Sequence, residues 1–156
     1  MLLAVNEMTE NLATQILYWK YDKPYDFYNN EVTEESLKEL MNGSYRAVID
    51  EKEALIGFFC TGLSAQVPTG KQYGVYDDPF IDIGLGMDPN LVGKGNGYDF
   101  CTFFLGQLEE SNKDIPIRLT VASFNKRAIR LYEKLGFVKQ SEFSTDSAEF
   151  LTMIRK

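Results

Sequence analysis

The 156-residue chain is 44% hydrophobic and 25% charged, which are the proportions of an ordinary globular protein with one full core. Its 16 basic and 23 acidic residues give a net charge of −7, which argues against nucleic acid or an anionic membrane as a partner. The sequence contains no histidine. This excludes Ser-His-Asp and Cys-His nucleophile systems, and no catalytic metal is expected. Acid–base chemistry must therefore use carboxylates, tyrosine, lysine or water.

The two cysteines, Cys60 and Cys101, lie inside apolar runs, so we expect buried thiols and a reducing compartment rather than a disulfide. The N-terminus has a short apolar run with no basic segment before it, and no later segment approaches transmembrane length. We therefore expect a cytosolic, or cytoplasmic, protein with no membrane partner.

The first part of the chain predicts a strand, two helices and a hairpin. Residues 2–5 read as a short strand, and Thr9 is a plausible N-cap for a helix over 10–21. A turn-rich aromatic stretch follows, and a second helix is expected to end at Asn42-Gly43.

Two strands joined by a short charged connection come next. Residues 45–50 and 54–62 should form an antiparallel hairpin. The stretch 64–79 contains two prolines and two glycines, and it is expected to be a long irregular loop. Residues 79–87, PFIDIGLGM, then read as a strand.

The remaining elements alternate between helix and strand. A helix is expected from residue 96 or 97 to 110, because apolar side chains recur on one stripe. A strand over 116–122, a helix over 125–135 and a closing hairpin over 137–143 and 149–154 complete the chain.

The element order β-α-α-β-β-β-α-β-α-β-β predicts one α/β (α+β) domain spanning residues 1–156. The β-α-β unit from 80 to 122 should contain a right-handed parallel crossover, whereas the hairpins are antiparallel. We therefore expect a mixed seven-stranded sheet with helices on both faces.

A glycine-rich segment, VGKGNG, lies between a predicted strand and a predicted helix. It is no phosphate loop of the Walker type, because Gly95 follows Lys94 where a Ser or Thr is required. It is no dinucleotide fingerprint either, because Tyr98 stands where the third glycine belongs. The backbone amides and helix dipole at such a place can still bind an anion, while a tight turn without a ligand is the alternative.

A second motif, FNKRAIRLYEKLGF, follows a further predicted strand. Together the two motifs resemble the GNAT superfamily of acyl-CoA-dependent N-acetyltransferases, whose element order also matches along essentially the whole chain. The motif positions of that family in this sequence are Gly95, Gly97, Asn125, Ala128, Tyr132, Gly136 and Phe137. One position departs from the family pattern, because Val92 stands where Arg or Gln is usual, so a side-chain contact to the cofactor is lost.

The resemblance implies that acetyl-CoA (coenzyme A) binds with its pyrophosphate on the glycine-loop amides and its pantetheine arm along the strand 79–87. Gly84 and Gly86 should leave one face of that strand bare. The resemblance also implies that a backbone N–H there, that of Met87, polarises the thioester carbonyl. The cofactor-binding residues so implied are Leu85, Gly86, Met87, Val92, Gly93, Lys94, Gly95, Asn96, Gly97, Asn125, Ala128 and Tyr132.

Tyr132 lies seven residues after Asn125, so both project from one helical face. In the family pattern the matching tyrosine protonates the departing thiolate, whereas a tyrosine at this spacing alone is more often a core aromatic. Asn125 is expected to cap the helix, to contact the pantetheine amide, or to do both.

The amine must lose a proton, since an unperturbed lysine-type amine has a pKa of about 10.4. Asp82 is the preferred general base, acting through water, and it is also assigned to substrate binding. An ion pair with Arg118 is the rival interpretation of Asp82. Asp77, Asp78 and Glu142 are the other carboxylates considered.

The aromatic stretch 22–30 lies where this fold places acceptor-binding residues. Tyr25 and Tyr28 are expected to line the acceptor pocket, although packing against the core is an alternative for these aromatics. The acceptor is left open among a polyamine, an antibiotic, a protein N-terminus and a lysine.

The sequence thus predicts an N-acetyltransferase in which a primary amine of a small molecule or peptide attacks acetyl-CoA directly in a ternary complex. Cys101 is not expected to act as a nucleophile. The alternative is a non-catalytic acyl-CoA-binding sensor or regulatory domain, which needs neither Tyr132 nor a base. A homodimer is compatible with the resemblance, since homodimers are common in the superfamily.

Overall fold

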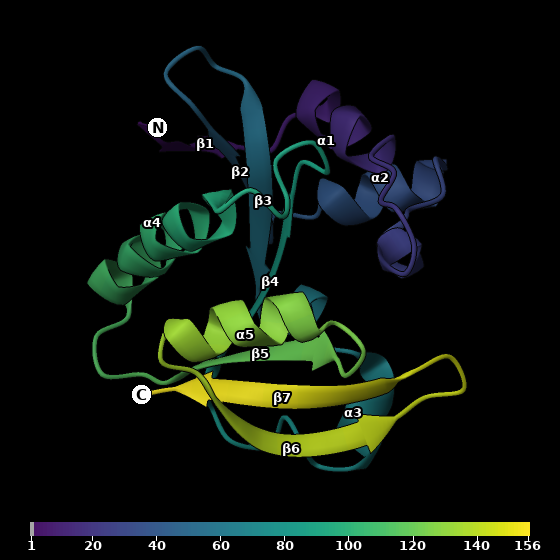
Figure 1. Cartoon of the computed structure of the whole chain (residues 1–156), viewed down its shortest axis with the longest axis vertical. Helices are drawn as coiled ribbons and strands as arrows, with labels where there is room; N and C mark the ends of the chain where they lie inside the picture. Colours follow the sequence, from purple (N-terminus) through teal and green to yellow (C-terminus); the bar gives the residue numbers. More distant parts are fainter. Residues whose placement is uncertain (1) are drawn as a thin grey trace. The chain divides into compact units, whose positions relative to one another are not determined.

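The computed structural model describes residues 2–156, in which seven strands form one mixed sheet of order β1-β2-β3-β4-β5-β7-β6 (Figure 1). The strands are β1 (Ala4–Glu7), β2 (Tyr45–Ile49), β3 (Leu55–Thr61), β4 (Ile81–Met87), β5 (Ile117–Ala122), β6 (Val138–Ser144) and β7 (Glu149–Arg155). The helices are α1 (Glu10–Leu17), α2 (Glu34–Leu40), α3 (Pro68–Gln72), α4 (Asn96–Ser111) and α5 (Lys126–Lys134), with short 3-10 helices η1 (Tyr25–Tyr28) and η2 (Gly62–Ala65). The predicted fold class is therefore confirmed.

The chain divides into two compact units, and strand β4 contributes residues to both. The first unit contains the chain up to Cys60 together with Leu85–Phe104. The second unit contains Thr61–Gly84 and Leu105–Lys156.

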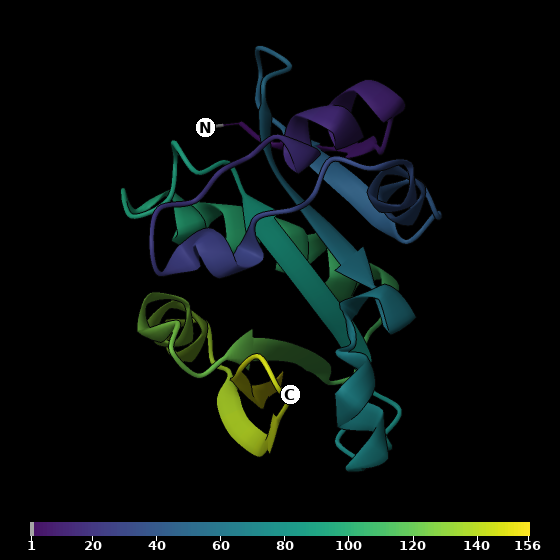
Figure 2. The same cartoon turned by 90° about the vertical axis from the view of Figure 1, so that its right-hand side faces the viewer.

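In the first unit, β1 and β3 both pair antiparallel with β2, as the predicted hairpin requires. Alternate residues of β3 point to opposite faces, so Phe58 packs near Trp19 beyond α1 while Phe59 stacks on Phe104 of α4. Helices α1 and α2 therefore cover one face and α4 covers the other (Figures 1 and 2).

Helix α1 is shorter than the sequence predicts, because it ends at Leu17 instead of continuing to residue 21. Thr9 caps its start as expected, with its side chain accepting a hydrogen bond from the N–H of Leu12. The apolar spacing that suggested a longer helix includes Trp19, whose ring instead lies 6.1 Å from that of Phe58. Tertiary packing of this tryptophan thus replaces the last predicted turn.

In the second unit, β4 runs parallel to β5, and β5 and β6 both run antiparallel to β7. Helix α5 and helix α3 lie on opposite faces of these strands (Figure 2). The segment 64–79 is not the long irregular loop that its prolines and glycines predict, since it contains part of η2 and all of α3. Pro68 occupies the first turn of α3, where its missing N–H costs nothing.

Cys60 and Cys101 are both buried and unbridged, as expected. Burial raises the pKa of the Cys101 thiol to about 12, which keeps it protonated at neutral pH and unsuited to act as a nucleophile. Across residues 2–156, no helix has both the length and the apolar character needed to cross a bilayer.

Candidate active site

The glycine-rich segment forms a series of turns that leads directly into α4 at Asn96. Gly93 and Gly95 have φ angles of 74° and 82°, a left-handed conformation that favours glycine. A Cβ atom placed on Gly95 would meet nothing within 4 Å, so this side of the loop is open. The first turn of α4 carries N–H groups without intrahelical acceptors and the positive end of the helix dipole, which is a donor set that fits a pyrophosphate.

The side chains of this segment differ in whether they can contact a bound anion. The Asn96 amide nitrogen donates to the carbonyl of Leu91 at 3.2 Å and so ties the two ends of the loop together. Lys94 is exposed and Val92 is half-buried. Asn96 is therefore arranged to shape the loop, and Lys94 is the charged side chain of the loop that can reach an anion.

Strand β4 continues past its pairing with β5. The parallel register joins Ile81, Asp82 and Ile83 to β5 and ends there, four residues before Met87. Leu85 to Met87, the last residues of β4, lie outside that pairing.

Glycine does not leave the face of β4 bare at Gly86, so that part of the sequence prediction is wrong. A Cβ at this position would collide with the ring of Phe58, which fills the space from β3. Gly57 has a related role, because a Cβ there would lie 2.5 Å from the carbonyl oxygen of Gly86. These glycines serve the close approach of β3 and β4, and the edge of β4, not its glycine face, is what a ligand could pair with.

Helix α5 carries Tyr132 and begins at a side-chain cap. The Asn125 side chain accepts a hydrogen bond of 3.1 Å from the N–H of Ala128, which confirms the predicted capping role. Tyr132 is 9% exposed, and its ring meets that of Phe137 edge to face at 6.1 Å. The cap and this aromatic contact fix the direction of the Tyr132 side chain.

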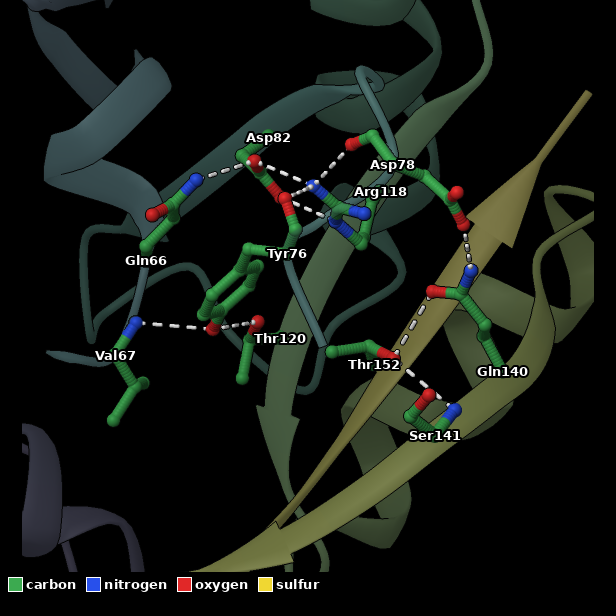
Figure 3. Close-up of polar contacts among 10 residues, drawn as sticks. All are labelled: Gln66, Val67, Tyr76, Asp78, Asp82, Arg118, Thr120, Gln140, Ser141 and Thr152. Atoms are coloured by element: carbon green, nitrogen blue, oxygen red, sulfur yellow. Dashed lines mark hydrogen bonds and ion pairs between the residues drawn. The ribbon is translucent and has the colours of Figure 1, made fainter. Parts of the chain in front are cut away.

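Asp82 forms the ion pair that the sequence left open as its rival role (Figure 3). Arg118 Nε lies 2.6 Å from Asp82 Oδ1, and Arg118 Nη2 lies 2.9 Å from Oδ2. The Gln66 amide also donates to Oδ2 at 2.8 Å, and the two charged side chains are 5% and 1% exposed. Both carboxylate oxygens are thus occupied by donors, and a proton arriving on either would face another N–H. This geometry argues against Asp82 as the general base.

The surroundings of Arg118 fasten the segment 62–80 to the sheet. Its guanidinium lies 5.2 Å from the ring centre of Tyr76 and 5.3 Å from that of Phe80. The Tyr76 hydroxyl is 2.7 Å from the hydroxyl of Thr120 and accepts the N–H of Val67 (Figure 3). Burial raises the pKa of Tyr76, so its hydroxyl stays neutral. Among residues 2–156, Arg118 Nη1 is buried without a hydrogen-bond partner.

The other carboxylates considered as bases lie at the surface. Asp77, Asp78 and Glu142 are exposed, and Glu142 pairs with Lys139 at 3.1 Å. Of the three, Asp78 touches the buried network, since its backbone carbonyl accepts from Arg118 Nη2 at 3.2 Å and its carboxylate accepts from the Gln140 amide at 3.5 Å (Figure 3).

The predicted acceptor residues Tyr25 and Tyr28 both belong to η1. Tyr25 is half-buried, while Tyr28 is 37% exposed and meets the ring of Phe27 edge to face at 5.2 Å. Sequence reasoning missed Tyr21 instead, whose hydroxyl donates to the carbonyl of Met87 at 2.7 Å. The sequence places Tyr21 at the end of the predicted helix 10–21, directly before the aromatic stretch, and gives no further signal for it.

A family model described as the acetyltransferase (GNAT) family matches residues 9–137. No curated protein sequence gives a significant match.

Solved structures of the same fold include a GNAT-family acetyltransferase from Bordetella pertussis, with a TM-score of 0.77, 15% identity and coverage of 99% of this chain and 95% of that one. Aminoglycoside acetyltransferase AAC(6′)-Ib in complex with ribostamycin and coenzyme A gives a TM-score of 0.75, 18% identity and coverage of 100% and 94%. A spermidine N-acetyltransferase chimera from Vibrio cholerae and hSSAT gives 0.66, 20% identity and coverage of 99% and 95%. The family match over most of the chain shows that it belongs to the GNAT family and is an acyl-CoA-dependent N-acetyltransferase.

Proposed function

We propose that the chain, acting over residues 1–156 as one catalytic domain, transfers the acetyl group of acetyl-CoA to a primary amine by direct attack in a ternary complex. The observation that carries the proposal is the pairing of two features in one GNAT chain. A glycine turn opens onto the N-terminus of α4, and a capped helix holds the buried Tyr132. A sensor domain would need the first feature but not the second.

The residues proposed to hold the cofactor follow from these two elements and from β4. The amides of Gly93 to Gly97, with the exposed Lys94, would bind the pyrophosphate. The backbone of β4 from Leu85 to Met87 would pair with the pantetheine amides. When bound, acetyl-CoA supplies an activated thioester.

The chain itself supplies a hydrogen-bond donor and a proton to the transfer. The backbone N–H of Met87 would donate to the carbonyl oxygen of the acetyl group, where negative charge develops. The hydroxyl of Tyr132 would give its proton to the departing sulfur. The ordered N-terminus of α5, held by Asn125, would keep that hydroxyl in place.

Removal of the amine proton is assigned to water. The Asp82 carboxylate is committed to Arg118 and Gln66, so it is left out of this step. A solvent-exposed carboxylate such as Asp78 would assist through the same water. The named activities of the similar structures, on spermidine and aminoglycosides, belong to those proteins. They support a cationic amine as the acceptor class here, as does the net charge of −7.

Release of free thiol from acetyl-CoA, measured with a panel of primary amines, tests the proposal. The Tyr132→Phe variant should lower kcat by about a hundredfold, because the proton donor is lost while the ring remains. Its affinity for coenzyme A should stay within a few-fold of that of the wild type.

A matched control is Tyr73→Phe, since Tyr73 is an exposed tyrosine directly after α3. This variant should retain full activity. Binding of coenzyme A without turnover of any amine by the wild-type chain would favour the sensor function instead.

A further inference from the structure

Tyr21 is held at the end of β4 by contacts within the first unit. Its hydroxyl donates to the Met87 carbonyl at 2.7 Å, although 66 residues separate the two in sequence. Its backbone N–H donates to the Asn29 side chain at 2.8 Å. The neighbouring Lys20 ammonium donates to the carbonyl of Asn30 at 3.3 Å, so both ends of the segment 20–30 are fastened together. These contacts of the segment 20–30 therefore determine the position of the Tyr21 hydroxyl.

The hydrogen bond to Met87 determines whether the Tyr21 hydroxyl can act as a donor or as an acceptor towards a ligand. A carbonyl oxygen only accepts, so the single phenolic proton is directed at Met87. Towards any further group the oxygen acts through its lone pairs, as a hydrogen-bond acceptor. An amine nitrogen carries N–H donors, which makes it the complementary group.

Aromatic side chains lie beside Gly86, the residue of β4 that directly precedes Met87. The ring of Phe58 covers Gly86, and Trp19 lies 6.1 Å from it at an interplanar angle of 30°. Tyr45 lies 6.0 Å from Phe58 on another side. Trp19 and Phe58 are both half-buried, so part of each ring is accessible. We call Trp19 and Phe58 the aromatic wall.

We propose that Tyr21 is an acceptor-binding residue, whose oxygen accepts an N–H of the incoming amine while the aromatic wall binds the apolar body that carries it. The inference rests on the proposed function and names its substrate class: a primary amine on an aromatic or extended apolar group. In the transfer the N–C bond forms as the C–S bond breaks. The nitrogen loses one proton to water, and the sulfur takes one from Tyr132, which water then restores.

Two commercial amines probe the wall with acetyl-CoA as donor. The wild-type chain should use 2-phenylethylamine with a kcat/KM about tenfold above that for ethanolamine, because one well-packed aromatic contact contributes about 1.4 kcal/mol. The Trp19→Leu variant should bring the two values closer together. Equal use of the two amines by the wild type would overturn the inference while leaving the proposed function standing.

Tyr21→Phe probes the hydroxyl, because it keeps the ring and removes the oxygen. Its kcat/KM for 2-phenylethylamine should fall about tenfold, as expected for one lost hydrogen bond to a charged or developing charged group. The KM for acetyl-CoA should remain within twofold of the wild-type value. A purely structural role predicts the opposite pattern, in which the acetyl-CoA KM rises and the amine KM does not.

Tyr18→Phe is the control, since Tyr18 is an exposed tyrosine at the end of α1 and should tolerate the change without effect. Unchanged kinetics in Tyr21→Phe would overturn the assignment of Tyr21. Absence of thiol release with every amine would instead overturn the proposed function, and this inference would fall with it.

Discussion

At the scale of single residues, burial and partners decide which ionisable groups can do chemistry. Asp82 and Tyr132 are both buried members of the predicted site. The Asp82 carboxylate meets three N–H donors, which suits a permanent charge and opposes proton transfer. Tyr132 lies on α5, and its ring meets that of Phe137 edge to face. The ion pair therefore has a structural role, and proton donation is proposed for Tyr132 instead.

Replacement of one partner of the buried pair should be costly. Asp82→Asn leaves the Arg118 charge uncompensated, so the free energy of unfolding should fall by about 3–5 kcal/mol in urea titrations. The double variant Asp82→Leu with Arg118→Met removes both charges and should recover most of that loss.

The double variant also keeps the assignment testable if Asp82→Asn does not fold. We expect its kcat to retain the pH profile of the wild type. A stable double variant that lost the acidic limb of that profile would identify Asp82 as the base and contradict the structural role.

At the scale of elements, the loop before α4 differs from its family pattern at one position. The Val92 side chain offers no donor where an Arg or Gln is usual, so the proposed anion site depends on backbone amides and Lys94. Val92→Arg should therefore lower the Kd for coenzyme A about tenfold, as one added charge-assisted hydrogen bond would do. Isothermal titration calorimetry measures the change.

Val138→Arg adds the same charge at an exposed position of β6 and serves as the control. It should leave the Kd almost unchanged, and raised salt should reduce the gain in Val92→Arg. An equal gain in both variants would mean that net charge alone, and no contact from position 92, sets the affinity.

Local sequence signals were sufficient to predict the elements whose structure is determined by residues close together in the chain. The hairpin of β2 and β3, the glycine turn before α4 and the Asn125 cap of α5 lie within a residue or so of prediction. Each is specified by neighbours in sequence: a short polar connection, positive-φ glycines, or a side chain three residues from its partner.

Elements fixed by distant contacts were not predictable in this way. The conformation of the segment 62–80 depends on two long-range contacts. Tyr76 bonds to Thr120, 44 positions away, and Asp82 bonds to Arg118, 36 positions away. The apolar run predicts β1 over residues 2–5, but the strand is Ala4–Glu7. Its backbone pairing with β2 includes Asn6 and Glu7, and this pairing does not depend on the polarity of their side chains. The Tyr21 contact to Met87 is likewise invisible to a local reading.

At the scale of the whole molecule, the proposed chemistry draws on residues that are far apart in the chain. The aromatic wall lies near the N-terminus and on β3, the anion-binding turn precedes α4, and Tyr132 lies on α5. The two motifs were enough for the sequence to indicate the family, because they sit in the donor-binding elements. No such motif marks the residues proposed for the acceptor side, of which Tyr21 and Phe58 contact β4.

Product analysis by mass spectrometry, with isotope-labelled acetyl-CoA and 2-phenylethylamine, spermidine and ribostamycin as amines, tests the central claim most directly. The account predicts that label appears as an amide on at least one of these amines, in an amount equal to the coenzyme A released. Bound coenzyme A with no labelled amide on any amine would contradict it and leave a ligand-binding domain without transferase activity.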